Sequence, residues 1–164
     1  TLEYCKKFEW IKTYKRSESI SGDHSLNKLI DIVPEICEGK FILWTHVTSP
    51  LFNSKCYNEF IKSFFKKKIK RSTFSADLIQ KFLYQKEKKW ISHNNKKNKW
   101  PRSQDLNPTF IVNSAAFMAS RKTYEKAKDR LCKNPYPLIS KGNTGFDIDT
   151  RDDFEKLKKL RIQI

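Results

Sequence analysis

Long apolar runs, glycine and acidic side chains are all scarce in this chain of 164 residues. No run approaches the roughly 18 consecutive apolar residues of a membrane-spanning helix, so we expect no membrane span. The 4 glycines form no phosphate-binding loop of the G-x-x-x-x-G-K-[ST] type, which excludes a P-loop nucleotide site. Only 18 acidic side chains stand against 34 lysines and arginines, giving a formal net charge of +16.

Cysteine and histidine are also few. The 4 cysteines form no C-x-x-C pair, and the 3 histidines lie at no metal-ligand spacing from them. A hydrophobic content of 38% is ample for a packed core without disulfide bonds. We therefore expect a single domain over residues 1–164, with ordinary thiols and a cytoplasmic location.

The excess of basic residues is concentrated in the middle of the chain, at residues 66–71, 86–89 and 96–99. Such runs form either a polyanion-binding groove or a solvated face. No aromatic RNA-binding motif, helix-turn-helix pattern or zinc finger accompanies them. We therefore expect no nucleic acid as the main partner, and a basic RNA-associated module is kept as an alternative. A basic surface also suits a small, highly charged ligand such as a nucleotide.

Strands and helices alternate along the first half of the chain. Apolar spacing predicts a helix over 26–33, capped by Asp23 or Ser25, with Pro34 disturbing its end. The apolar run at 41–44 is typical of a buried parallel strand. A polar loop and a helix starting at Asn53 or Ser54 follow. Because α/β sheets bind ligands beyond the carboxyl ends of their strands, this loop is well placed for a site.

The second half begins with an extended excursion at residues 72–102, which has little core of its own. A strand or hairpin at 109–118 then returns the chain to the core, and a helix is expected over 121–131. Thr150 and Asp153 form a capping box for a last helix. We expect that helix to bury Phe154, Leu157 and Leu160.

Asp147 and Asp149 form the sharpest chemical feature. In extended backbone, residues two apart point to the same side, so both carboxylates can converge on one hard cation. Mg²⁺ is usually held by one or two carboxylates together with substrate phosphates. The alternative is that both are turn acids before the last helix. Asp152 and Asp153 are better explained by the favourable field of the helix N-terminus.

Two polar loops offer further binding groups. Arg102 carries a planar fork suited to carboxylate or phosphate, and Gln104 can both donate and accept hydrogen bonds. Thr48 and Ser49 follow the strand at 41–44, where their hydroxyls can meet a ribose or a phosphate. Exposed polar loops are the alternative interpretation of both.

Taken in order, these motifs resemble the acylneuraminate cytidylyltransferase family, which makes CMP-activated nonulosonic acids such as sialic acid. The matching stretches span nearly the whole chain: residues 15–23, 44–51, 100–106, 113–117 and 146–154. The resemblance implies an α/β nucleotidyltransferase fold, a three-layer sandwich around a Rossmann-like mixed sheet. It also implies a protruding dimerisation segment at residues 72–102. Such an enzyme is a homodimer that transfers CMP from CTP to a nonulosonic acid and releases pyrophosphate.

The resemblance implies roles for individual residues. Asp147 and Asp149 match the family's catalytic, magnesium-binding acids. Arg102 matches a basic residue that reaches from the dimer partner toward the carboxylate of the sugar, and Gln104 matches a glutamine of the sugar pocket. Phe117 falls near the apolar wall for the N-acyl group.

The remaining matches are Thr48 on the substrate side, His46 at a position where many relatives carry glutamine, and Arg16 and Ser25 near the cytidine. The family's N-terminal strand and its loop that grips the triphosphate of CTP have no counterpart here. We therefore expect the chain to be part of a longer enzyme and inactive alone. The same fold acting on 3-deoxy-manno-octulosonate or a pseudaminic-type acid is one alternative. A non-catalytic sugar- or nucleotide-binding remnant is the other.

Overall fold

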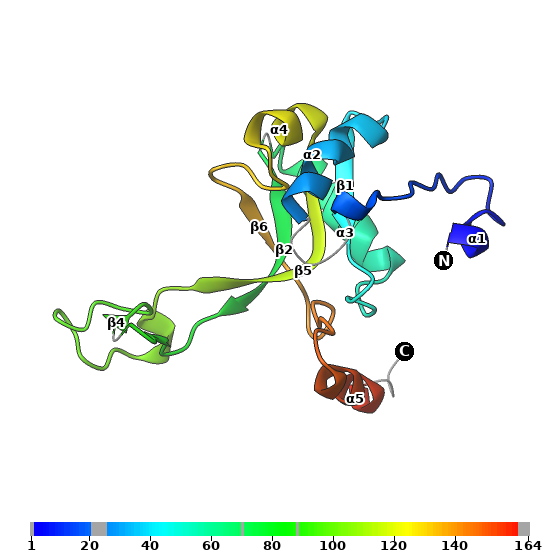
Figure 1. Ribbon diagram of the computed structural model, residues 1–164. Helices are drawn as coiled ribbons and strands as arrows, with labels where there is room; N and C mark the ends of the chain where they lie inside the picture. The colour runs from blue at the N-terminus through cyan, green and yellow to red at the C-terminus, as the bar shows by residue number, and fades with distance from the viewer. Residues whose placement is uncertain (1, 21–25, 70, 88, 161–164) are drawn as a thin grey trace.

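The structure is a computed structural model that describes residues 2–20, 26–69, 71–87 and 89–160 (Figure 1). These residues form a mixed α/β fold whose main sheet has the strand order β1-β5-β2-β6. Strands β1 and β2 run antiparallel to β5, and β6 runs parallel to β2. The strands of this sheet are β1 (Phe41–Thr45), β2 (Thr73–Ile79), β5 (Thr109–Ser120) and β6 (Tyr136–Ile139).

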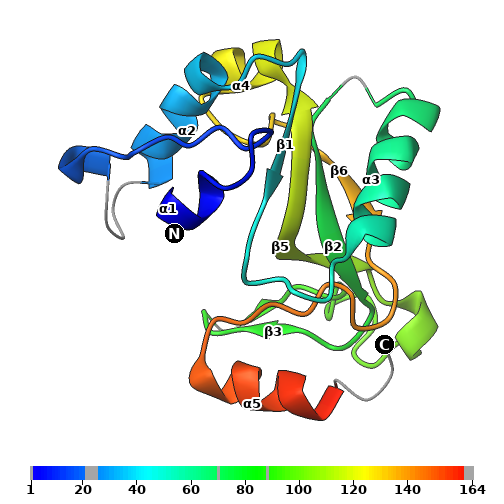
Figure 2. The same ribbon diagram turned by 90° about the vertical axis from the view of Figure 1, so that its right-hand side faces the viewer.

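Helices cover both faces of the sheet and give it three layers. Figure 2 shows α2 and α4 on one side and α3 on the other. On the first side, Ile30 and Val33 of α2 pack with Ile42 of β1. On the second, Phe60 and Phe64 of α3 pack against β5. The described part of the chain has five α-helices: α1 (Leu2–Cys5), α2 (Leu26–Ile36), α3 (Ser54–Lys66), α4 (Arg121–Ala127) and α5 (Arg151–Leu160).

The predicted helices α2 and α3 are confirmed, with Ile30 and Val33 of α2 and Phe60 and Phe64 of α3 buried, whereas Leu26 at the start of α2 is exposed. Asn53 caps α3, since its side-chain oxygen accepts a hydrogen bond from the Cys56 N–H at 3.2 Å. Pro34 lies inside α2, which continues to Ile36. The predicted caps of α2, Asp23 and Ser25, lie outside the described residues.

The prediction of a parallel strand at 41–44 is wrong. Strand β1 is antiparallel to β5, with Leu43 opposite Met118, and within the described ranges it pairs on one side only. An apolar run indicates that a strand is buried, but the direction of the strand depends on its partner, which lies about 75 residues further along the chain. Of the two predictions for 109–118, a strand or a hairpin, the strand is confirmed. Ser114 within it has a φ of 60°, and the register with β2 shifts between Phe74 and Ala76.

Helix α4 ends at Ala127, short of the predicted residue 131. Lys128 takes a left-handed conformation with φ 52° and ψ 34°, and its N–H bonds back to the Tyr124 carbonyl. This turn closes the helix in the manner of a left-handed C-cap. The chain beyond it, including Arg130, therefore returns over the sheet.

Between β2 and β5 the chain leaves the sheet as an arm, residues 80–108, which protrudes from the body (Figure 1). Two short strands, β3 (Tyr84–Gln85) and β4 (Lys89–Trp90), and the 3₁₀ turn η2 (Ser103–Asp105) lie in it. The rings of Phe82, Trp90 and Trp100 lie 5.4 to 6.1 Å apart and form a small aromatic cluster. Of the predicted excursion, residues 73–79 belong to the main sheet as β2.

The capping box of α5 is confirmed. The Thr150 N–H donates to Asp153 Oδ2 at 3.0 Å, and the Asp153 N–H donates to Thr150 Oγ1 at 3.2 Å. The predicted buried face is wrong, because no α5 residue is buried and Phe154 is 47% exposed. The helix lies beyond the end of the sheet, apart from the helices that cover the faces of the sheet (Figure 1). Within the described ranges, no helix combines the length and apolar character that crossing a membrane requires.

Candidate functional site

The loop after β1 and the segment before α5 meet at one end of the sheet. The Ile148 N–H donates to the Thr48 carbonyl at 2.9 Å, and Ser49 Oγ donates to Asp147 Oδ1 at 3.3 Å. Ser49 is buried. Two stretches that are far apart in the sequence, and that were both singled out from it, are therefore joined by hydrogen bonds.

Asp147 and Asp149 differ in their surroundings. Asp147 is half-buried, and its Oδ1 also accepts a hydrogen bond from the Ile148 N–H at 3.1 Å. Asp149 is exposed. Across the described ranges, no group of three or more His, Cys, Asp or Glu side chains is arranged to hold a metal. Two carboxylates fit Mg²⁺ only when water and substrate phosphates complete its oxygen ligands.

Asn113 holds the segment that carries Asp147 against the sheet. Its buried amide nitrogen donates to Asp77 Oδ1 at 3.0 Å and to Ser140 Oγ at 2.8 Å. Gly145 lies against the same amide and has no room for a side chain. The sequence predicts Asn113 within a strand or hairpin but predicts no role for it, because its partners come from β2 and from the loop after β6.

His46 lies between two hydrogen-bond donors. Its Nε2 is 3.0 Å from Trp44 Nε1 and 3.0 Å from an Arg130 guanidinium nitrogen. Both neighbours can only donate, so Nε2 accepts and the ring is the neutral tautomer protonated on Nδ1. Burial, followed by the charge of Arg130, lowers the pKa of His46, while Asp147 acts in the opposite direction. His46 is therefore a neutral group near Asp147.

Arg130 completes a cluster that the sequence analysis missed. Its guanidinium carbon lies 4.1 Å from the Phe117 ring centroid and 5.3 Å from that of Trp44. Burial lowers the pKa of Arg130 from its usual value. We refer to Trp44, His46, Phe117 and Arg130 as the Arg130 cluster. Residue 130 was expected on a helix, so no sequence signal pointed to it.

The other predicted site residues lie elsewhere. Arg102 is exposed on the arm and forms an ion pair with Asp105, with Nε and Oδ2 2.9 Å apart. Gln104 is also exposed on the arm, where its carbonyl accepts a hydrogen bond from Gln80 at 2.9 Å. Arg16 is exposed in the stretch before α2, and Ser25 lies outside the described residues.

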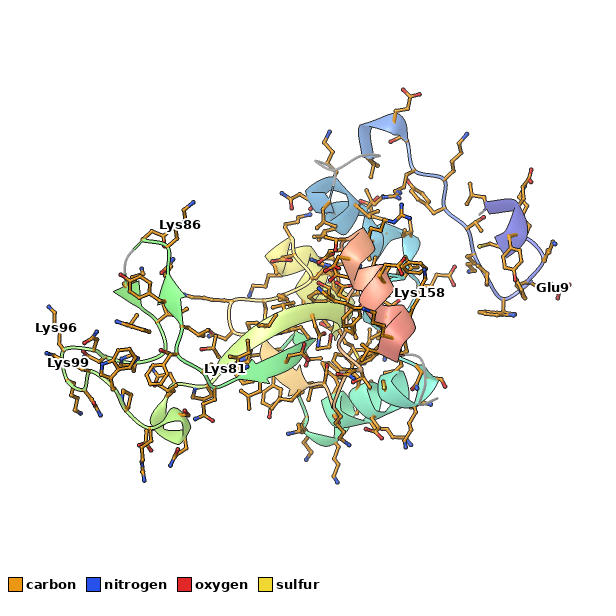
Figure 3. All side chains as sticks on the ribbon, turned by 90° about the horizontal axis from the view of Figure 1, so that it is seen from below. Glu9, Lys81, Lys86, Lys96, Lys99 and Lys158 are labelled. Atoms are coloured by element: carbon orange, nitrogen blue, oxygen red, sulfur yellow. The ribbon has the colours of Figure 1, made fainter. Side chains whose placement is uncertain are left out.

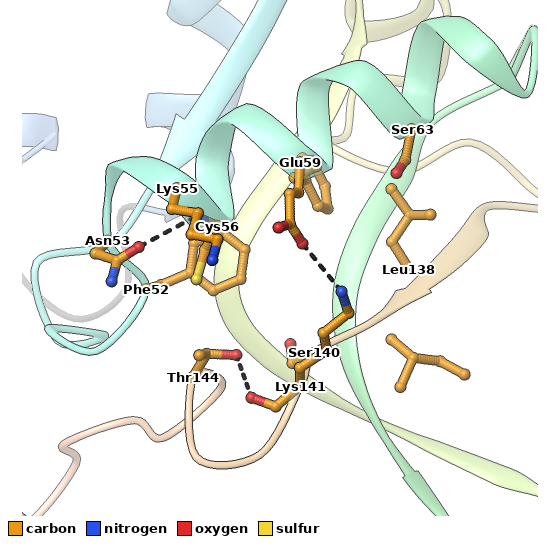
Figure 4. Close-up of a pocket in the computed structure, with 12 residues that line it drawn as sticks. Phe52, Asn53, Lys55, Cys56, Glu59, Ser63, Leu138, Ser140, Lys141 and Thr144 are labelled. Atoms are coloured by element: carbon orange, nitrogen blue, oxygen red, sulfur yellow. Dashed lines mark hydrogen bonds and ion pairs between the residues drawn. The ribbon is translucent and has the colours of Figure 1, made fainter. Parts of the chain in front are cut away.

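A separate pocket of about 380 Å³ lies between α3 and β6 (Figure 4). Two of its three charged side chains form an ion pair, since Lys141 Nζ is 3.3 Å from Glu59 Oε2, and Lys55 is the third. Thr144 Oγ1 donates to the Lys141 carbonyl at 2.8 Å. The pocket lies on the α3 face, away from the Arg130 cluster, and none of the predicted site residues lines it.

Comparison with known proteins gives a partial similarity. No protein-family model matches the chain. Over 53 residues it is 36% identical to the N-acylneuraminate cytidylyltransferases of Streptococcus agalactiae serotypes III and Ia. This stretch is 32% of the chain and only 13% of the length of these relatives. One stretch of the chain is thus similar to cytidylyltransferases.

One solved structure is also similar in shape. The structure of HddC from Yersinia pseudotuberculosis is 12% identical and has a TM-score of 0.43. The alignment covers 83% of this chain and 62% of that one. The score is too low for any argument about the site or the activity.

Proposed function

We propose that the chain is part of a nucleotidyltransferase that transfers CMP from CTP to a nonulosonic acid, a sialic-acid-like sugar, and releases pyrophosphate. The carrying observation is the hydrogen bond of 2.9 Å between Ile148 and Thr48. It joins the Asp-x-Asp segment to the loop that follows β1, a position where α/β sheets bind ligands. The 36% identity with cytidylyltransferases over 53 residues supports cytidine nucleotides as the substrate class.

In this proposal, Asp147 and Asp149 hold Mg²⁺. When bound, Mg²⁺ would neutralise the negative charge that develops on the transferred phosphate. Ser49 and the Ile148 N–H fix the orientation of the Asp147 carboxylate through bonds of 3.3 and 3.1 Å. Activity then depends on positioning and electrostatics rather than on a general base. His46 does not serve as that base, because its free lone pair already faces two donors.

The remaining roles follow the resemblance. Thr48 and His46 bind hydroxyls of the ribose or the sugar, and Arg16 and Ser25 contact the cytidine. Phe117 contributes to the wall of the sugar site, where it already supports the Arg130 guanidinium.

Arg102 acts in the site of a second copy, because its arm protrudes from its own body (Figure 1), and Gln104 binds the sugar. The arm exposes apolar surface, with Trp100 70%, Tyr84 57% and Ile91 46% exposed. Surface of this kind supports a two-fold homodimer formed through the arm.

The test uses the complete gene product, supplied with CTP, Mg²⁺ and either N-acetylneuraminate, 3-deoxy-manno-octulosonate or a pseudaminic-type acid. Mass spectrometry of the products should detect a CMP-sugar, formed together with pyrophosphate. Nucleotide binding without any CMP-sugar would instead support a non-catalytic remnant. Absence of both binding and turnover would reject the proposed function.

A further inference from the structure

The Arg130 cluster holds a positive charge that has no negative partner. Among the described residues, no carboxylate forms an ion pair with Arg130. Its sequence neighbour Asp129 is exposed and forms no ion pair with it, although the charge of Asp129 partly offsets the lowering of the Arg130 pKa. The Arg130 Nε is buried and has no hydrogen-bond partner within the described part of the chain. An arginine remains charged in proteins, so this charge cannot be removed by deprotonation.

The neighbours of Arg130 orient the guanidinium without neutralising it. The faces of Phe117 and Trp44 lie 4.1 and 5.3 Å from its central carbon. One of its terminal nitrogens donates to neutral His46 at 3.0 Å. Stacking and one neutral acceptor recover only part of the hydration that a half-buried cation loses. The guanidinium is therefore held in one place with part of its donor set unused.

The position of the cluster connects it to the proposed site. His46 follows β1 and precedes Thr48, whose carbonyl holds the Asp147 segment at 2.9 Å. The Asp147 carboxylate is close enough to raise the pKa of His46. The charges of Arg130 and Asp147 thus both act on His46, in opposite directions. The hydrogen bond from Arg130 to His46 and that from Ile148 to Thr48 connect the guanidinium to the loop that holds the Asp147 segment.

A purely structural role for Arg130 is the alternative. Buried arginines that only stabilise a fold are paired with carboxylates or carbonyl oxygens, because an unpaired buried charge is destabilising. Arg130 has neither kind of partner among the described residues, whereas its contacts are aromatic rings and a neutral histidine. A guanidinium with unused N–H donors can bind an oxyanion through two parallel hydrogen bonds, and the arrangement around Arg130 suits that role.

We propose that Arg130 binds an oxyanion of the ligand, a carboxylate or a phosphate, and so makes the site selective for acidic ligands. The assignment of this oxyanion to a particular substrate rests on the proposed function. There it is the carboxylate of the sugar acid or the α-phosphate of the nucleotide. Arg130 would provide a carboxylate site within the same chain, separate from Arg102 on the arm.

Matched ligand pairs test the proposal in the complete protein. Calorimetry would compare N-acetylneuraminic acid with its methyl ester, and CMP with cytidine, because the members of each pair differ by one anionic group, a carboxylate in the first pair and a phosphate in the second. In at least one pair, we expect the charged member to bind about 10- to 100-fold more tightly, the range for hydrogen bonds to a charged group. The pair that shows the difference identifies the oxyanion.

The variants are Arg130→Gln, Arg130→Lys and, as a matched control, Arg121→Gln. Arg121 is also a partly buried arginine with an unpartnered Nε, but it begins α4 and contacts none of the cluster. Arg130→Gln should abolish the preference for the charged ligand, and Arg121→Gln should keep it. Arg130→Lys retains the charge without the fork and should keep a reduced preference. It also provides the comparison if Arg130→Gln fails to fold.

Three results would overturn the proposal: equal affinities within both pairs, no binding of any of the four ligands, or an unchanged preference in both Arg130 variants. The outcome for the proposed function is read separately. An Arg130-dependent preference without formation of CMP-sugar supports the oxyanion site and rejects the transferase. Formation of CMP-sugar with an unchanged KM in Arg130→Gln supports the transferase and rejects the oxyanion site.

Discussion

Gly145 lies so close to Asn113 that a β-carbon at position 145 would be 2.1 Å from the amide nitrogen of that side chain. The same β-carbon would be 2.6 Å from Asp77 Oδ1. Both atoms belong to the hydrogen bond of 3.0 Å that ties β5 to β2. The glycine therefore lets the chain pass over this pair on its way to Asp147.

Replacing Gly145 with alanine should push Asn113 away and break its bonds to Asp77 and Ser140. We expect a loss of about 1–3 kcal/mol in the free energy of unfolding, from overpacking and from buried polar groups left unpaired. Urea denaturation of the complete protein measures it. Gly142→Ala is a comparison with another cause of loss, since a β-carbon there meets no atom within 4 Å but φ is 56°, a strained conformation for alanine. No measurable loss in Gly145→Ala would contradict the packing argument.

Asp149→Asn should lower turnover by orders of magnitude, because a metal that stabilises the transition state contributes several kcal/mol. Stability should change by no more than about 0.5 kcal/mol, since Asp149 is exposed. Asp153→Asn should weaken the start of α5 and leave turnover nearly normal, because Asp153 is engaged by Thr150. A magnesium titration should show a raised requirement in Asp149→Asn alone. Equal activity losses without that shift would reject the metal assignment.

Dimerisation through the arm should respond to a charge at Ile91. This side chain is 46% exposed, and aspartate there leaves the aromatic cluster of Phe82, Trp90 and Trp100 intact. We expect Ile91→Asp to weaken a homodimer at least tenfold, as measured by sedimentation equilibrium. Ile139→Asp is the control, since this residue is 55% exposed on β6, outside the arm. A monomeric wild-type protein at tens of micromolar would reject the dimer.

Salt should strengthen the same dimer. Lys86, Lys96 and Lys99 project from the arm into solvent (Figure 3), and two arms in contact would bring like charges together. Raising the ionic strength from about 0.05 to 0.5 M screens this repulsion. A dimer that dissociates at high salt would contradict this expectation.

The pKa of His46 should make stability depend on pH. In the folded protein this pKa lies below its ordinary value, mainly because of burial, while in the unfolded chain it returns to about 6.5. The unfolded state therefore binds a proton first as the pH falls. The contribution is fully present above about pH 6.5 and is lost below it, toward the folded-state pKa.

Unfolding curves at several pH values, compared with His46→Gln, measure this dependence. The variant should lose stability less steeply between about pH 7.5 and 5.5. Arg130→Gln should raise the pKa of His46, because the charge of Arg130 is one cause of its depression. An identical pH profile in wild type and His46→Gln would contradict the assignment.

Local patterns in the sequence predicted helices α2, α3 and α5 and the caps of α3 and α5. The faces of α2 and α3 depend on residues three and four positions apart, and the Thr150 capping box lies within one turn, so nearby residues decide these features. The rule that ligand loops follow strand ends also directed attention to Thr48. The structure joins that loop to the Asp147 segment.

Features that depend on distant partners could not be predicted. The direction of β1 is decided by β5, far along the chain. Arg130 reaches the sheet because Lys128 adopts a left-handed conformation, for which lysine gives no sequence signal. The spacing of Phe154, Leu157 and Leu160 predicts an apolar face, but not whether another element is there to cover it.

Because its apolar face is uncovered, we expect α5 to unfold locally while the sheet stays folded. Because it buries no residue, its amide protons should exchange through excursions that leave the sheet intact. The amides around Phe117, which is 2% exposed, should exchange only through global unfolding. Asp149 lies between the sheet and α5, one residue before the α5 capping box, and so joins the slowly exchanging part of the chain to the rapidly exchanging part. Hydrogen exchange followed by mass spectrometry would show whether a ligand bound at Asp147 and Asp149 slows the exchange of the α5 amide protons.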